Sequence, residues 1–282
     1  MGKVLIAMSG GVDSSVAAYL LKHSGWDCVG ATMTLYRNED IGISRSRTCC
    51  SLEDVEDARS VAFRLRIPYY VFNFSDEFRR QVMDRFADAY GQGRTPNPCI
   101  DCNRYLKFRH LYDRAALLGC DTIATGHYAR IERENGRYLL KKALGASKDQ
   151  SYVLYMLTQE QLAHTRFPLG TLHKTEAREL AGRLGFFNAR KPDSQDICFV
   201  PDGDYAAFIR RHTGKADALG DFVDESGRIL GRHKGIAHYT IGQRKGLGIP
   251  SNRLLYVKAI DPKSNQVVLS GNDALFSQQL TG

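Results

Sequence analysis

The stretch that most constrains the fold is SGGVDSS at residues 9–15. It follows an apolar run at residues 4–8, which predicts a buried strand, and it precedes a helical pattern over residues 14–24. The two glycines let backbone N–H groups approach an anion, the serine hydroxyls add donors, and the helix N-terminus adds partial positive charge. Strand, glycine turn and helix in this order predict a phosphate-binding site, whereas the plainer alternative is a strand-to-helix turn with a serine cap.

The stretch is not a Walker loop, because no G-x-x-x-x-G-K-[ST] pattern occurs and no lysine follows the glycines. It resembles the pyrophosphate-binding loop of the ATP pyrophosphatases. That resemblance implies cleavage of ATP between its α- and β-phosphates, attachment of AMP to a substrate oxygen, and displacement of AMP by a nucleophile. The loop alone leaves the substrate open.

Predicted strands and helices alternate through the first half of the chain. We expect strands at residues 4–8, 28–35, 69–74 and 122–125, and helices at 14–24, from 51, from 76 and at 103–118. Repeated strand–helix units predict an α/β fold, a Rossmann-like parallel sheet with helices on both faces. The SGGVDSS loop then lies at the carboxyl ends of the strands, where such sheets bind ligands. We assign this catalytic domain to residues 1–201.

The pattern changes after His127. Two alternating runs flank Asn135-Gly136, which is a strong hairpin signal. We expect helices at residues 158–164, 174–185 and 203–213, and short strands at 221–223, 237–241, 254–260 and 266–270. The glycine-rich segment 202–282 is therefore predicted to form a small β-rich domain.

Composition limits the class of protein and the compartment. The net charge of +8 permits a polyanionic partner such as RNA without showing one. An apolar run of membrane-spanning length and a signal peptide are both missing from the sequence, so we expect a cytoplasmic protein without a membrane partner. The cysteines number seven, an odd count that argues against a structural disulfide framework.

Two cysteine segments carry candidate chemistry. In residues 94–103, two prolines stiffen the chain, and Cys102 falls at a predicted helix start, which would lower the pKa of its thiol. Cys198 lies in a second segment, residues 194–199. Three interpretations stay open: a catalytic pair of Cys102 and Cys198, a metal or iron–sulfur site of Cys99, Cys102 and Cys198, or inert thiols.

The combined motifs resemble the tRNA-specific 2-thiouridylases, which replace the C2 oxygen of the wobble uridine by sulfur. The resemblance covers essentially the whole chain. It rests on residues 9–15, 32–33, 49–51, 94–99 with 102–103, 125–130, 148–152, 194–199 and 238–244.

The resemblance implies roles for individual residues. ATP, with Mg²⁺, would contact Ala7, Met8, Ser9, Gly10, Gly11, Val12, Asp13, Ser14, Met33 and Gly126. The tRNA would contact Asn97, Pro98, Cys99, Lys148, Asp149 and Gln150. Cys102 would be the nucleophile and Cys198 the persulfide carrier, with a transient disulfide between them. A sulfur-relay protein or cysteine desulfurase would supply the sulfur.

Two departures from the family matter. Many members carry Asp where this chain has Cys99, and this third thiol strengthens the alternative of thiolation through an iron–sulfur cluster. The C-terminal β-barrel of the family is expected to be largely absent here.

Other functions kept open are an ammonia-using ligase of the same superfamily and a cluster-bearing RNA-binding or redox protein without turnover. Asp13 could hold magnesium or cap the following helix, and His127 could donate to a phosphate or pack at a strand end.

Overall fold

The structure is a computed structural model that describes residues 2–42, 52–193 and 196–277. The chain divides into two compact units, and each is described by itself. The first unit consists of Met1–Val82 and Pro98–Pro201, and the second of Met83–Asn97 and Asp202–Gly282. In the part of the chain that the structure describes, no helix has the length and apolar character needed to cross a bilayer.

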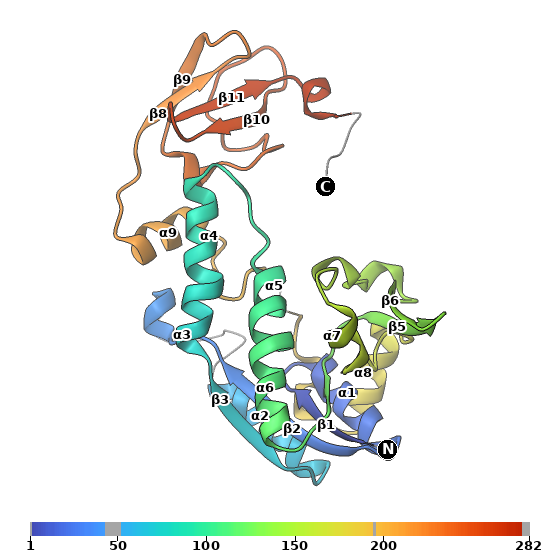
Figure 1. Cartoon of the computed structure of the whole chain (residues 1–282). Helices are drawn as coiled ribbons and strands as arrows, with labels where there is room; N and C mark the ends of the chain where they lie inside the picture. The colour runs from blue at the N-terminus through green and yellow to red at the C-terminus, as the bar shows by residue number, and fades with distance from the viewer. Residues whose placement is uncertain (1, 43–51, 194–195, 278–282) are drawn as a thin grey trace. The chain divides into compact units, whose positions relative to one another are not determined.

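A parallel sheet forms the centre of the first unit (Figure 1). Its strand order is β3-β2-β1-β4-β7. The strands are β1 (Lys3–Ala7), β2 (Asp27–Thr34), β3 (Tyr69–Asn73), β4 (Thr122–Ala124) and β7 (Thr165–Arg166). Val4, Leu5 and Ile6 of β1 are fully buried, as a central strand covered on both faces requires. The predicted α/β fold with a parallel sheet is confirmed, while the two-residue edge strand β7 was too short to predict.

Helices flank this sheet. They are α1 (Val12–His23), α2 (Leu52–Arg64), α3 (Ser75–Phe78), α5 (Pro98–Asp101), α6 (Leu111–Leu117), α7 (Gln159–Ala163) and α8 (Lys174–Arg183), with π-helical turns at Arg79–Met83 and Cys102–His110. Short 3₁₀ turns occur at Asn38–Ile41, Ala146–Lys148, Ser151–Val153 and Phe187–Arg190. Ala17 and Ala18 of α1 and Ala177 and Ala181 of α8 belong to one buried cluster, so small side chains let these helices approach closely.

The predicted hairpin is present as β5 (Ala129–Glu134) and β6 (Arg137–Lys142). Asn135 and Gly136 have φ angles of 49° and 79°, the left-handed pair that a two-residue hairpin turn needs.

The second unit contains a four-stranded sheet with the order β10-β11-β8-β9. Its strands are β8 (Gly220–Val223), β9 (Ile229–His233), β10 (Tyr256–Asp261) and β11 (Gln266–Ser270). The helices of this unit are α4 (Asp84–Gly91) and α9 (Tyr205–Thr213), with 3₁₀ turns at Ile236–His238 and Asn272–Leu275. Phe222, Val257, Val267 and Leu269 are buried in its core.

One strand prediction in this unit is wrong. Residues 237–241 were expected to be extended, but Ile236–His238 forms a 3₁₀ turn that starts after Gly235 at φ 133°. The strand lies earlier, at β9, which contains Gly231 and whose residues do not alternate between buried and exposed.

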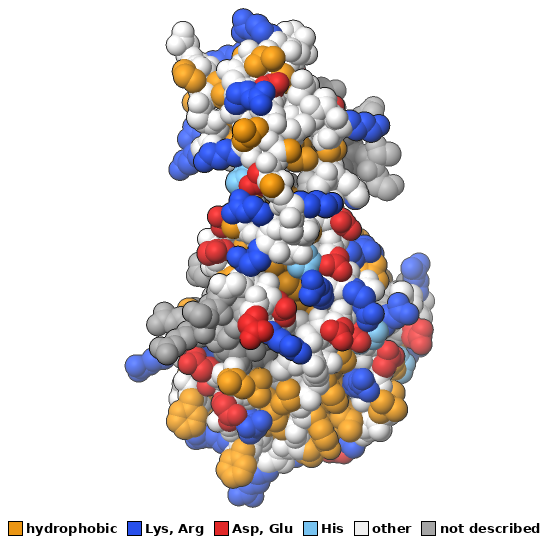
Figure 2. Space-filling view, turned by 90° about the vertical axis from the view of Figure 1, so that its left-hand side faces the viewer, with side chains coloured by type: hydrophobic (Ala, Val, Ile, Leu, Met, Phe, Trp, Pro, Cys, Tyr) orange, Lys and Arg blue, Asp and Glu red, His pale blue; other side chains and the backbone are white. Residues whose placement is uncertain are grey.

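Figure 2 shows several Lys and Arg side chains on the face of the second unit that is turned to the viewer, at the top of that view. The net charge of the whole chain is +8, and its basic residues are spread along the sequence instead of gathered in one segment.

Candidate active site

The SGGVDSS loop lies between the carboxyl end of β1 and the start of α1. Gly10 has φ 74°, and a Cβ there would collide with the backbone carbonyl of Asp54. Gly11 is the N-cap of α1 and makes no side-chain cap bond. The first N–H groups of a helix have no partner within it, so the start of α1 presents donors suited to an anion. The predicted geometry of strand, glycine turn and helix is present.

The hydroxyl groups of Ser14 and Ser15 make hydrogen bonds within the loop. Ser14 Oγ donates to the carbonyl of Gly11 over 3.0 Å and accepts from the N–H of Ser9 over 3.1 Å. Ser15 Oγ also donates to the carbonyl of Gly11, over 3.0 Å. Both serines are buried. In this structure both hydroxyl protons are donated within the turn, so the expectation that these hydroxyls donate to a phosphate stays a prediction.

The buried side chain of Asn188 makes hydrogen bonds to the loop. Its Nδ2 donates to the carbonyl of Gly10 over 2.8 Å and to Ser15 Oγ over 2.9 Å. The side chain is buried. Sequence reasoning missed this residue, because nothing in the motifs connects a lone asparagine after α8 with a loop so far back in the chain.

Met33 and Gly126, the residues expected to contact adenosine, belong to the strands on either side of β1 or to their ends. Met33 lies near the end of β2, and Gly126 lies two residues after the end of β4; these strands are the two neighbours of β1 in the sheet. A Cβ on Gly126 would come within 2.8 Å of both Asp13 C and Ser14 N. The absence of a side chain at Gly126 is therefore what lets the β4 connection lie against the first turn of α1.

Asp13 does not cap α1. Tyr128 donates from its hydroxyl to Asp13 Oδ1 over 2.8 Å, and Lys174 Nζ lies 2.8 and 2.7 Å from the two carboxylate oxygens. Burial, followed by the nearby Asp13 carboxylate, raises the pKa of Tyr128, so the tyrosine keeps its proton and remains a donor. Tyr128 and Lys174 both escaped the sequence analysis as site residues.

A second carboxylate, Asp193, gathers three cations. Lys174 lies 2.8 Å from it, Arg178 2.7 Å and Lys148 3.0 Å. Burial alone would raise the pKa of Asp193, but the hydrogen bonds from Lys174 and Lys148 outweigh it and hold the pKa well below its usual range. Lys174 therefore bridges two carboxylates, one of them in the phosphate loop.

The predicted tRNA-contact segment 148–150 adjoins this cluster. Asp149 accepts from the N–H of Ala143 over 2.9 Å and from Ser151 Oγ over 2.7 Å. Gln150 Oε1 accepts from the N–H of Tyr128 over 3.0 Å. Asp149 and Gln150 thus fix the local backbone, and Lys148 is the more exposed member of the three.

The structure changes the prediction for Cys102. The helix begins at Pro98, one turn earlier than expected, so Cys102 lies inside it instead of at its N-terminus. Its thiol is buried, and burial raises its pKa, although Lys107 acts in the opposite direction. The predicted low pKa is wrong because the exposure that would stabilise a thiolate is missing.

Cys198 is half-buried and its main chain is anchored. Tyr36 donates from its hydroxyl to the Cys198 carbonyl over 2.7 Å. The next residue, Phe199, is buried and packs edge-on against Phe78 at 5.6 Å between ring centroids. Cys102 and Cys198 are both free thiols in this structure, so the transient disulfide expected between them stays a prediction.

The remaining predicted residues lie around the start of the same helix. Asn97 and Cys99 are exposed and Pro98 is buried. Cys99 and Cys102 lie about one helical turn apart. Among residues 2–42, 52–193 and 196–277, no three His, Cys, Asp or Glu side chains are gathered in a way that could hold a metal ion. The motif at residues 49–51 lies outside the described residues.

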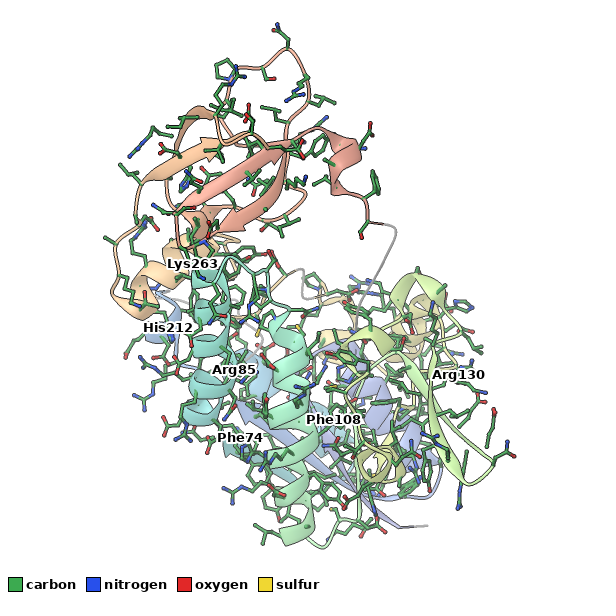
Figure 3. The ribbon with its side chains drawn as sticks, turned by 45° about the horizontal axis from the view of Figure 1, so that its top comes forward. Phe74, Arg85, Phe108, Arg130, His212 and Lys263 are labelled. Atoms are coloured by element: carbon green, nitrogen blue, oxygen red, sulfur yellow. The ribbon has the colours of Figure 1, made fainter. Side chains whose placement is uncertain are left out.

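His127 packs at the end of β4. Its Nδ1 lies 2.6 Å from Thr125 Oγ1, and its ring lies 6.2 Å from that of Phe108, which Figure 3 labels on the helical segment Cys102–His110. Burial, followed by the charge of Lys107, lowers the pKa of His127 well below its ordinary value. These contacts match the interpretation of a packed strand-end histidine.

The basic hairpin makes ion pairs within itself. Arg130, labelled in Figure 3, lies 2.6 Å from Glu132, and Lys141 lies 2.5 Å from the same carboxylate. Lys141 also pairs with Glu134. These two glutamates pair with two of the five basic residues of the hairpin, so the hairpin keeps a net positive charge.

Comparison with known families covers both units. A family model described as the tRNA methyl transferase HUP domain matches residues 2–202, and one described as the tRNA methyl transferase PRC-barrel domain matches residues 206–271.

Individual relatives give the same picture. The chain is 55% identical over 282 residues to a tRNA-specific 2-thiouridylase MnmA of Lachnoclostridium phytofermentans, covering 99% of this chain and 79% of that protein. It is 53% identical over 280 residues to a protein of the same name from Clostridioides difficile, covering 99% and 77%. A similar solved structure, a 4-thiouridine synthetase–RNA complex with bound ATP, has a TM-score of 0.49 and 22% identity, covering 71% of this chain and 45% of that one.

Proposed function

Because this chain belongs to the family of the tRNA-specific 2-thiouridylases, which are sulfurtransferases, we propose that it replaces the C2 oxygen of the tRNA wobble uridine by sulfur, using ATP. The observation that carries the proposal is the phosphate loop at residues 9–15, folded between β1 and α1 as an ATP site requires. An identity of 55% over nearly the whole chain supports a shared reaction.

In the activation step, ATP lies on residues 7–14, with its adenosine toward Met33 and Gly126. The uridine C2 oxygen attacks the α-phosphate, and pyrophosphate leaves. Backbone N–H groups at the start of α1 stabilise the leaving group, because they are fixed before the charge develops. Asp13 is the residue that would hold Mg²⁺, whose chemistry is to neutralise phosphate charge, and a carboxylate oxygen suits that ion.

In the sulfur step, Cys198 carries a persulfide delivered by a sulfur-relay protein or a cysteine desulfurase. The terminal persulfide sulfur attacks C2, and AMP leaves with the former uridine oxygen. The Cys102 thiolate then attacks the Cys198 sulfur and releases 2-thiouridine. The two cysteines are left as a disulfide, which a thiol reductant must reopen. Burial raises the pKa of Cys102 in this structure and so disfavours the thiolate that this step uses.

The tRNA is proposed to contact two segments. Asn97 and Cys99 are exposed at the start of the helix that carries Cys102, which supports a contact of residues 97–99 with the target base. Lys148 offers a charge to a phosphate, while Asp149 and Gln150 hold the backbone that presents it.

The test combines thiolation with iron analysis on one anaerobic preparation. We expect ATP- and tRNA-dependent formation of 2-thiouridine, detected by mass spectrometry of nucleosides, together with AMP and pyrophosphate. Cys102→Ser and Cys198→Ser should abolish 2-thiouridine. Cys120→Ser, which changes a buried cysteine of the same unit outside the proposed site, is the matched control and should retain it.

Two results would redirect the proposal. Intact thiolation by Cys102→Ser would remove the thiol-exchange step. Stoichiometric iron and sulfide whose content tracks activity would instead make Cys99, Cys102 and Cys198 ligands of a cluster. A preparation that cleaves no ATP to AMP and pyrophosphate in the presence of tRNA would refute the proposed reaction altogether.

A further inference from the structure

Lys174 is the most enclosed cation near the phosphate loop, with 13% of its side chain exposed. It is the first residue of α8 and reaches Asp13 in α1 and Asp193 beyond α8. Its ammonium also lies 5.9 Å from the centre of the Tyr128 ring. We call Asp13, Tyr128, Lys174 and Asp193 the Asp13 cluster.

The loop needs a cation that its own sequence does not supply. Backbone N–H groups and the α1 N-terminus provide only about half an elementary charge. Asp13 adds a negative charge in the first turn of that same helix, which would repel a polyphosphate. Lys174 compensates this carboxylate in the structure, since its Nζ lies within 2.8 Å of both Asp13 oxygens.

Lys174 can leave Asp13 while both side chains keep another polar partner. If Lys174 turned away from Asp13, that carboxylate would keep the hydrogen bond from Tyr128. Lys174 itself would keep its contact with Asp193, which Arg178 holds in place from one turn further along α8. The lysine can therefore release Asp13 without leaving either partner unpaired.

We propose that Lys174 is a phosphate-binding residue of this site, exchanging its contact with Asp13 for the β- and γ-phosphates of ATP while Asp193 holds it in position. Lys174 thus stabilises the pyrophosphate that leaves in the activation step. The inference rests on the proposed use of ATP, but it does not depend on the identity of the substrate that receives AMP.

The direct test measures ligand binding to the whole chain by isothermal titration calorimetry. Lys174→Met removes the charge and keeps the length of the side chain. We expect its Kd for ATP and for pyrophosphate to rise about 10- to 100-fold, the range of a charge-assisted hydrogen bond, and its Kd for AMP to change less than about twofold. Lys22→Met, at the opposite end of α1, is the control and should bind all three ligands as the wild type does.

A second variant separates ligand binding from a purely structural role. Asp13→Asn releases Lys174 from its loop partner, so in EDTA, without divalent cations, pyrophosphate should bind several-fold more tightly than to the wild type. If the cluster only braced the fold, Asp13→Asn and Lys174→Met would both weaken binding. Because loss of the Asp13 charge by itself favours an anion, Asp13→Asn is compared with the double variant Asp13→Asn/Lys174→Met. Loss of the gain in the double variant supports the contact from Lys174, and an unchanged gain overturns it. If Lys174→Met proves too unstable to titrate, Lys174→Gln takes its place in both variants.

The outcomes distinguish this inference from the proposed function. Equal loss of ATP and AMP affinity in Lys174→Met, or no loss of either, would overturn the role of Lys174 even if the wild type thiolates tRNA. Selective loss of pyrophosphate and ATP affinity would support it even if 2-thiouridine never formed.

Discussion

Replacing Asn188 tests whether the phosphate loop depends on its interior support. In Asn188→Ala, Ser15 Oγ keeps its own bond to the Gly11 carbonyl, but the carbonyl of Gly10 loses the bond from Nδ2. Gly10 is buried. A buried group left unsatisfied costs about 1–3 kcal/mol, so we expect the free energy of unfolding to fall by about that amount. With the loop less well fixed, the Kd for ATP should rise about tenfold or more.

Asn188→Asp sharpens this prediction. The aspartate has nearly the same shape, but its ionised carboxylate cannot donate to the Gly10 carbonyl and places a negative charge beside an anion site. ATP affinity should therefore decrease in the order Asn188, Ala, Asp. If only the volume of the side chain mattered, the aspartate variant would bind ATP better than the alanine variant.

Urea unfolding followed by fluorescence is the appropriate assay, because the single tryptophan, Trp26, packs against the core of the first unit and reports on it. Asn103→Ala is the matched control. Like Asn188, Asn103 is buried, donates to a backbone carbonyl, and has an Oδ1 atom without a partner among the described residues. It should lose stability without a direct loss of ATP affinity. Unchanged stability and unchanged ATP binding in Asn188→Ala would refute the reasoning.

Further predictions concern one glycine, two thiols and one histidine. Gly10→Ala should abolish ATP binding, measured by calorimetry, because the backbone is left-handed there and the new Cβ meets the carbonyl of Asp54. Alkylation with iodoacetamide at pH 7.5, followed by peptide mass spectrometry, should label exposed Cys99 well before Cys102, because burial raises the pKa of the Cys102 thiol. Equal labelling rates would contradict the burial of Cys102. His127 has a folded-state pKa below its unfolded value, so its contribution to stability is present above about pH 6.5 and is lost as the pH falls below that value. Urea unfolding between pH 7 and 5 should therefore show a smaller decline in His127→Gln than in the wild type.

Local patterns were enough to predict the parts of the site that lie next to each other in sequence. The apolar run of β1, the two glycines and the apolar face of α1 define the loop, and Asn135-Gly136 defines the hairpin turn. Met33 and Gly126 entered only through the family resemblance, and the sheet order places their strands on either side of β1.

Two supporting residues could not be found in this way. Asn188 and Lys174 contact the loop across more than 150 positions of sequence, and each is an ordinary polar residue in its local context. Only the packing of α8 beside α1 brings them to residues 10–15.

The state of Cys102 was misjudged for a different reason. Its position relative to a helix start could be estimated to within about a turn, and one turn is the distance over which an N-terminal charge effect disappears. Burial, which decides the direction of the pKa shift, depends on what covers the helix and leaves no trace in residues 94–103.

The bond from Tyr36 to the carbonyl of Cys198 limits how sulfur can travel. While this bond and the packing of Phe199 against Phe78 last, rotation about the Cα–Cβ bond is the motion left to the Cys198 sulfur. Carrier proteins that move a bound group between distant active sites hold it on a long, flexible segment, whereas the main chain at Cys198 is anchored. Under the proposed function, the sulfur donor and the tRNA must then each come to the same anchored thiol, one after the other.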